Sequence, residues 1–249
     1  MIMIKTINDL INERKAKLNK SQFCTWLSSE DMNQEDRFAF VPSQAFLVMS
    51  FKDMLDLIKI KNPVSKYDHL VNEHCLEDKD HWKWYLHDLK CLGFDMDTWG
   101  NSANDVLSQL WSDDTFLVRD VVYTSIHYIK LSKSPIYSLV IIEILEAVFA
   151  VFAKHMEQRV RREEMFEQLE YYGRTHVEKE QSHNLWEEDE IKYDTLLNSH
   201  ELTNCKDAID SIFSMFDNIF DNWYDDRNTR FKYNRDKTKL FNTKNTDLT

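Results

Sequence analysis

Residues 134–162 read SPIYSLVIIEILEAVFAVFAKHMEQRVRR and contain a long apolar run. A serine followed by a proline is a typical helix start, because the serine side chain caps the first turn and proline fits the first helical position. Between residues 139 and 152 the run is interrupted only by Glu143 and Glu146. A helix that is apolar nearly all round is buried. The stretch therefore predicts a central helix that carries two acidic side chains.

The composition favours an all-α fold. The 249 residues include only 3 glycines and 3 prolines, and 43% are hydrophobic. Scarce turn formers favour long helices, and the apolar content is ample for a core. Apolar residues at helical spacing predict further helices at 4–18, 21–27, 36–60, 63–92, 101–111, 115–131, 163–187 and 198–224. Whether Gly173 interrupts the helix at 163–187 stays open. We expect a single helical bundle of about seven or more helices over residues 1–225, and a polar, flexible C-terminal tail at 226–249.

The charge and the cysteines exclude several classes of protein. A net charge of −12 argues against binding to nucleic acid or to an anionic membrane, both of which require clustered Lys and Arg. The apolar run at 139–152 is too short to span a bilayer and carries two carboxylates. The 4 cysteines form no CxxC motif, which is typical of a reduced compartment. We expect a soluble cytoplasmic protein. The sequence leaves its oligomeric state open, with a homodimer as one candidate.

Two short segments share the spacing His-x3-acid-x2-His. They are HCLEDKDH at residues 74–81 and HVEKEQSH at residues 176–183. Positions i, i+4 and i+7 lie on one face of a helix, so each segment would direct two imidazoles and a carboxylate the same way. The residues concerned are His74, Asp78 and His81 in the first segment, and His176, Glu180 and His183 in the second.

These ligand types predict a metal site in the bundle. Helices that carry inward histidines and carboxylates hold the metal pairs of carboxylate-bridged proteins. A buried carboxylate needs a metal or a basic partner, and for Glu143 and Glu146 the non-metal alternative is Arg119 or Arg174. Imidazoles and carboxylates without cysteine suit iron or manganese better than structural zinc. We expect two metal ions, with Glu146 as the bridge and Glu143 as a second bridge or a hydrogen-bonding partner.

Five segments together resemble a known superfamily. They are FVP at 40–42, FKD at 51–53, EDKDHWKWYLHDLKCLG at 77–93, IEILE at 142–146 and YGRTHVEKEQSH at 172–183. The chain is similar here to the haem-oxygenase-like superfamily, the seven-helix bundle shared with TenA thiaminases and PqqC. It resembles most closely the di-iron oxidases of that superfamily, also called iron-containing redox enzymes. The last segment is the most specific of the five.

The resemblance implies a particular set of iron ligands. They are Asp78 or Glu77 with His81, then Glu146, and finally His176, Glu180 and His183. Some family members place a ligand seven residues before the first-helix histidine, where this chain has His74 instead of a carboxylate. A second departure is Phe149, which lies where the family has small residues.

The resemblance also implies the activity. Such an enzyme uses two iron ions, or alternatively manganese, to activate O2 and oxidise a small organic substrate. We expect the substrate to enter a cavity lined by Trp84, Tyr85, Phe149 and Tyr172. Three alternatives stay open: a metal-free TenA-like hydrolase that uses Cys75 or Cys91, a small-molecule-binding protein of the same fold, and a protein-interaction module.

Overall fold

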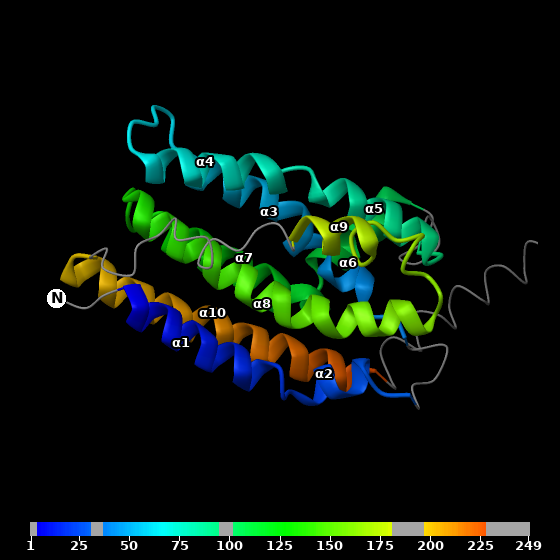
Figure 1. The fold of residues 1–249 in the computed structure, drawn as a ribbon. Helices are drawn as coiled ribbons and strands as arrows, with labels where there is room; N and C mark the ends of the chain where they lie inside the picture. Colours follow the sequence, from blue (N-terminus) through cyan, green and yellow to red (C-terminus); the bar gives the residue numbers. More distant parts are fainter. Residues whose placement is uncertain (1–3, 31–36, 95–101, 181–196, 228–249) are drawn as a thin grey trace, which may run out of the picture.

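The computed structural model describes residues 4–30, 37–94, 102–180 and 197–227, which fold into a bundle of α-helices (Figure 1). The α-helices are α1 (Ile4–Leu18), α2 (Gln22–Leu27), α3 (Ala45–Ile58), α4 (Lys66–Asp78), α5 (His81–Cys91), α6 (Ala103–Trp111), α7 (Phe116–Ile129), α8 (Pro135–Arg162), α9 (Arg174–Glu180) and α10 (Ser199–Asp226). Two short 3-10 helices, η1 (Val41–Gln44) and η2 (Asp113–Thr115), precede α3 and α7. No strand occurs in these residues, and the prediction of an all-α helical bundle is confirmed.

Helix α8 is the centre of the bundle. It packs against α1, α2, α4, α7 and α10, and Figure 1 shows it between the layer of α4 and α5 and the layer of α1 and α10. The Ser134 side chain caps it by accepting a hydrogen bond from the Tyr137 N–H, and Pro135 lies in its first turn, as expected. The buried side chains of all the layers join into one hydrophobic cluster. Of the expected tail, residues 228–249 lie outside the described residues.

The bounds of α8 agree with the helix predicted from the stretch at 134–162. One expectation is wrong, because this helix of 28 residues is long and apolar enough to cross a membrane, whereas the apolar run at 139–152 was taken as too short. However, 72% of its most apolar window is buried inside the protein. Burial by neighbouring helices is what the core helix of a soluble protein shows, and it supports this interpretation of α8.

The region predicted as one helix over 63–92 is two helices. The cap of α4 is Ser65, whose hydroxyl accepts from the Asp68 N–H at 3.1 Å, while the Asp68 carboxylate accepts from the Ser65 N–H at 2.7 Å. This reciprocal capping box places the start of the helix at Lys66, later than the predicted start at residue 63. Helix α4 ends at Asp78 and α5 begins at His81. The first histidine segment therefore spans a break between two helices.

The predicted helix over 163–187 is also wrong in its first part. Helix α8 ends at Arg162, and Glu164 has a φ of 59°, in the left-handed region. The Met165 N–H then donates to the Val160 carbonyl at 2.9 Å, which is the closing hydrogen bond of a Schellman motif. Glycine usually occupies this left-handed position, so the sequence contains no visible stop signal.

A compact turn over 165–173 then leads into α9. Gly173 is required there, because a Cβ atom on it would lie 2.0 Å from the Leu169 carbonyl oxygen and 2.5 Å from that of Phe166. The backbone crosses itself too closely for any side chain. This turn places α9 beside α5 (Figure 1).

Candidate metal site and adjoining cavity

Three potential metal ligands meet where α4 packs against α8. The His74 Nε2 atom lies 3.1 Å from Asp78 Oδ2 and 3.7 Å from Glu146 Oε1. One ligand atom from each of these residues lies within 4.8 Å of the other two. His74 and Asp78 are each only 4% exposed, and the Glu146 side chain is 19% exposed. These two helices thus bring an imidazole and two carboxylates together in the interior.

Two further histidines adjoin this group. The His81 Nε2 atom at the start of α5 lies 3.6 Å from Asp78 Oδ1. The His176 ring on α9 lies 4.5 Å from the His81 ring, measured between centroids. Both histidines are buried. The break between α4 and α5 therefore does not separate the first histidine segment, and its three predicted ligands still converge.

The geometry fits a first-row metal ion. Bonds from such ions to imidazole nitrogen and carboxylate oxygen are about 2.0–2.2 Å long, so two ligands of one ion lie at most about 4.4 Å apart. The separations of 3.1 and 3.7 Å from His74 to Asp78 Oδ2 and to Glu146 meet this limit. The 3.6 Å separation from His81 also meets it, but it is measured to the other carboxylate oxygen of Asp78. Cys75 is adjacent to His74, but burial raises the pKa of its thiol to about 12, which opposes the thiolate that a metal ligand must be. The donor set is therefore imidazole and carboxylate, which suits iron or manganese.

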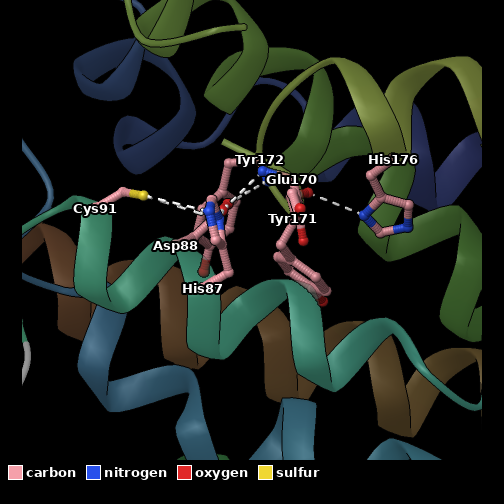
Figure 2. A network of polar contacts seen from close by, with 7 residues as sticks. All are labelled: His87, Asp88, Cys91, Glu170, Tyr171, Tyr172 and His176. Carbon is pink, nitrogen blue, oxygen red and sulfur yellow. Dashed lines mark hydrogen bonds and ion pairs between the residues drawn. The ribbon is translucent and has the colours of Figure 1, made fainter. Parts of the chain in front are cut away.

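The ring of His176 is oriented by the turn that precedes α9. Its Nδ1 atom lies 2.9 Å from the Tyr171 carbonyl oxygen (Figure 2). A carbonyl can only accept, so Nδ1–H is the donor and Nε2 is the nitrogen that can bind a metal. The Phe149 ring stacks on the imidazole, with 4.6 Å between centroids and 30° between planes.

Asp88 holds that turn in place. Its Oδ1 atom accepts from the Glu170 N–H at 2.7 Å and its Oδ2 atom accepts from the Tyr172 N–H at 2.9 Å (Figure 2). The carboxyl is fully buried, and burial raises its pKa, although both backbone N–H groups oppose the rise. Asp88 thus clamps the two residues that flank Tyr171.

Sequence reasoning missed the role of Asp88. It appeared only as one position of a resembling segment. A signal was present, because Asp88 lies three residues after Tyr85 and seven after His81 and so shares their buried helix face. An acid on that face needs partners, but nothing in the sequence pointed to the turn that supplies them.

The remaining predicted metal ligands lie elsewhere or outside the described residues. Glu77 is half-buried, and its backbone carbonyl accepts from Lys179 Nζ at 2.7 Å. Glu143 lies on α8, three residues before Glu146, and is not one of the three grouped ligands. The Glu180 side chain and all of His183 lie outside the described residues.

The two arginines proposed as non-metal partners of the buried glutamates are engaged elsewhere. Arg119 donates to the carbonyl oxygens of Leu110, Trp111 and Ser112 and to the Thr115 hydroxyl. Arg174 forms ion pairs with Glu167 and Glu178 on the surface. Among the described residues, His74 is a basic residue that contacts Glu146.

A cavity of about 90 Å³ adjoins the ligand cluster. It is bounded by side chains of α3, α8 and α10 and of the α4–α5 junction, and it includes Asp78, His81, Glu146 and His176 in its wall. Phe149, His176 and Tyr171 also form the wall of a second hollow of about 250 Å³, towards the C-terminal half of α8. These three residues therefore separate the two spaces.

The four residues predicted to line the substrate cavity have different positions. Phe149 lines both spaces and Tyr172 lines the second one. Tyr172 donates its hydroxyl to Gln44 Oε1 at 2.9 Å, and Tyr85 donates its hydroxyl to the Val41 carbonyl at 2.8 Å. Trp84 stacks on His81, with 4.4 Å between centroids. Trp84 and Tyr85 thus pack beside the site, and neither is in the wall of either space.

No protein-family model matches the chain, and no curated protein matches it either. The function of the site is therefore inferred from the chain's own residues and their geometry.

Proposed function

We propose that this protein is a non-haem iron oxidoreductase of the cytoplasm that uses O2 to oxidise a small organic substrate. The observation that carries the proposal is the approach of His74, Asp78 and Glu146, whose ligand atoms lie within 4.8 Å of one another in the interior. His81 and His176 complete the ligand set, and manganese is the alternative metal. The helical bundle is compatible with the haem-oxygenase-like resemblance of the sequence motifs.

Bound iron would supply the one-electron and O2 chemistry that side chains lack. The protein's own residues have three tasks. Asp78 and Glu146 balance the positive charge of the metal. The Tyr171 carbonyl keeps the proton of His176 on Nδ1. The aromatic side chains around the cavity keep bulk water away from the reacting groups.

A second iron belongs to the same proposal. Glu143, Glu146, Glu180 and His183 are the residues that would hold the second ion. Among the described residues, one group of three potential ligands lies close together, which is His74, Asp78 and Glu146. This group supports the first ion.

Metal binding by matched variants tests the proposal. Protein loaded anaerobically with Fe(II) is desalted and its iron content is measured. His74→Ala and Glu146→Gln should weaken iron binding by at least about tenfold, because each removes a direct ligand. His69→Ala and Glu73→Gln are the controls, since both side chains are exposed on α4. The controls should bind as the wild-type protein does.

Two results would refute the proposal. One is wild-type protein that takes up neither iron nor manganese. The cluster would then be held together by direct contacts between its histidines and carboxylates. The other is unchanged iron uptake by His74→Ala and Glu146→Gln, which would place the metal elsewhere.

The metal-free hydrolase has one observation in its favour. The Cys91 Sγ atom lies 3.6 Å from His87 Nε2, and His87 Nδ1 lies 3.2 Å from Asp88 Oδ1 (Figure 2). Thiol, imidazole and carboxylate in this order resemble a cysteine-hydrolase triad. However, Cys91 is the last residue of α5, where the helix dipole disfavours a thiolate, and it lines neither of the two hollows. Cys91→Ser should abolish a hydrolase activity and leave an iron-dependent oxidation unchanged.

A further inference from the structure

Two buried hydrogen-bond donors belong to residues that line the cavity of about 90 Å³ beside the ligand cluster, which we call the inner cavity. Gln44, at the end of η1, is 4% exposed, and its Oε1 atom accepts from Tyr172. Its Nε2 atom and the indole Nε1 of Trp82 on α5 are buried and have no hydrogen-bond partner among the described residues. Buried donors without an acceptor are rare in folded proteins because they are costly. Each therefore marks a place where a ligand would add an acceptor.

The size of the cavity limits the ligand. One water molecule needs about 10–15 Å³ of such space, so about 90 Å³ accommodates roughly six to nine water-sized groups. That excludes a long-chain substrate unless the cavity expands. The wall contains eight Phe, Tyr and Trp side chains, which are Phe51, Trp82, Phe149, Phe152, Tyr171, Phe216, Phe220 and Trp223. A compact apolar body, such as one ring, suits this wall.

The charges at the cavity favour a neutral polar group on the ligand. Asp78 and Glu146 are part of the wall and would repel an anion. Two lysines, Lys52 and Lys79, also line the cavity. The Lys52 ammonium group donates to Asp56 at 2.8 Å, and Lys79 is exposed to solvent. The two unmatched donors are both uncharged N–H groups. A carbonyl oxygen accepts from such groups without bringing a charge into the cavity.

We propose that the inner cavity binds a compact, mainly apolar molecule that presents a carbonyl oxygen to the side-chain donors of Gln44 and Trp82. The inference names the substrate class of the proposed oxidoreductase and in that sense rests on it. The binding itself requires no metal, so the two proposals can fail separately.

A pair of probes tests the inference on metal-free full-length protein. Acetophenone and isopropylbenzene have similar size and shape, but only acetophenone has a carbonyl oxygen. Titrations followed by NMR give the two dissociation constants. Acetophenone should bind about tenfold more tightly, since it alone satisfies a buried donor.

Variants assign that preference to the two residues. Gln44→Glu keeps an oxygen that can accept from Tyr172 and replaces the amide donor by a second oxygen. Trp82→Phe removes the indole N–H and keeps an aromatic ring at a partly exposed position. Each variant should lower the preference for acetophenone and leave isopropylbenzene binding nearly unchanged. Gln168→Met, at an exposed position in the turn before α9, is the control and should behave as wild type.

Three outcomes would overturn the inference: equal binding of the two probes, binding of neither, or full preference retained in both Gln44→Glu and Trp82→Phe. Iron uptake measured on the same preparations separates this from the proposed function. Iron binding without a carbonyl preference refutes the substrate class alone. A carbonyl preference without iron binding refutes the oxidoreductase alone.

Discussion

The Nδ1 atom of His176 lies 2.9 Å from the carbonyl oxygen of Tyr171, and this contact selects the ring nitrogen that remains for a metal. The carbonyl is itself held from both sides, because Asp88 accepts from the backbone N–H groups of Glu170 and Tyr172. A buried carboxylate on α5 thus positions a histidine on α9 through the backbone of the intervening turn.

Asp88→Ala should lower the free energy of unfolding by about 2–4 kcal/mol, because it leaves two buried backbone N–H groups without acceptors. Urea denaturation with linear extrapolation measures the loss. Asp53→Ala, at a side chain that is 77% exposed, is the control and should change stability by less than about 0.5 kcal/mol. A loss of similar size in both variants would contradict the role assigned to Asp88.

Gly173→Ala should be strongly destabilising, by at least about 2 kcal/mol, since its Cβ would meet backbone oxygen atoms that cannot move aside. Gly93→Ala is the matched comparison. Gly93 has a φ of 77°, but a Cβ atom added there would have nothing within 4 Å, so only backbone strain of about 1–2 kcal/mol is expected. Thermal unfolding of the two variants should place Gly173→Ala clearly below Gly93→Ala, and the reverse order would refute the close approach.

Glu164→Gly should stabilise the protein by about 0.5–1 kcal/mol. Glu164 is exposed and has a φ of 59°, where glycine avoids the strain of a side chain. Glu164→Ala removes the same carboxylate but keeps a Cβ, so it should leave stability nearly unchanged. If both substitutions stabilise equally, the gain comes from the lost charge and not from the backbone conformation.

His155 should make stability depend on pH. Its Nε2–H donates to Asn19 Oδ1, and burial lowers its pKa below 6.5. The folded state favours the neutral ring. The contribution of this ring to the free energy of unfolding is therefore complete above pH 6.5, and it is lost as the pH falls through the lowered pKa of His155. The stability difference between wild type and His155→Gln should therefore shrink from about pH 7.5 to about pH 5.5. A difference that stays constant or grows towards acid pH would contradict this assignment.

Bound Fe(II) should stabilise the wild-type protein. At a free concentration about 100 times the dissociation constant, the expected gain is about 2.7 kcal/mol, and a chelator should reverse it. Anaerobic thermal unfolding measures the shift. At the same iron concentration His74→Ala, which should bind at least about tenfold more weakly, should gain no more than about 1.4 kcal/mol, whereas His69→Ala should shift as the wild type does. A full wild-type shift in His74→Ala would point to a metal site that does not include His74.

Several features of the fold could be predicted because they depend on local interactions. The caps at Ser134 and Asn198 bond to backbone groups within the next three residues, so a short stretch contains all the information. The breaks in the predicted helices were missed because no residue type that usually ends a helix marks them. The α4–α5 break carries no glycine or proline, and the end of α8 at Glu164 has a glutamate where glycine is usual.

The sequence by itself determined an all-α bundle around α8 and marked the histidines and acids of residues 74–81 as candidate ligands, because helical periodicity and capping act over a few residues. Only the tertiary structure decided that His74 and Asp78 meet Glu146, that Asp88 clamps the turn before α9, and that Gln44 and Trp82 share one cavity. These contacts join residues far apart in the chain. They depend on how helices pack, which no local pattern encodes.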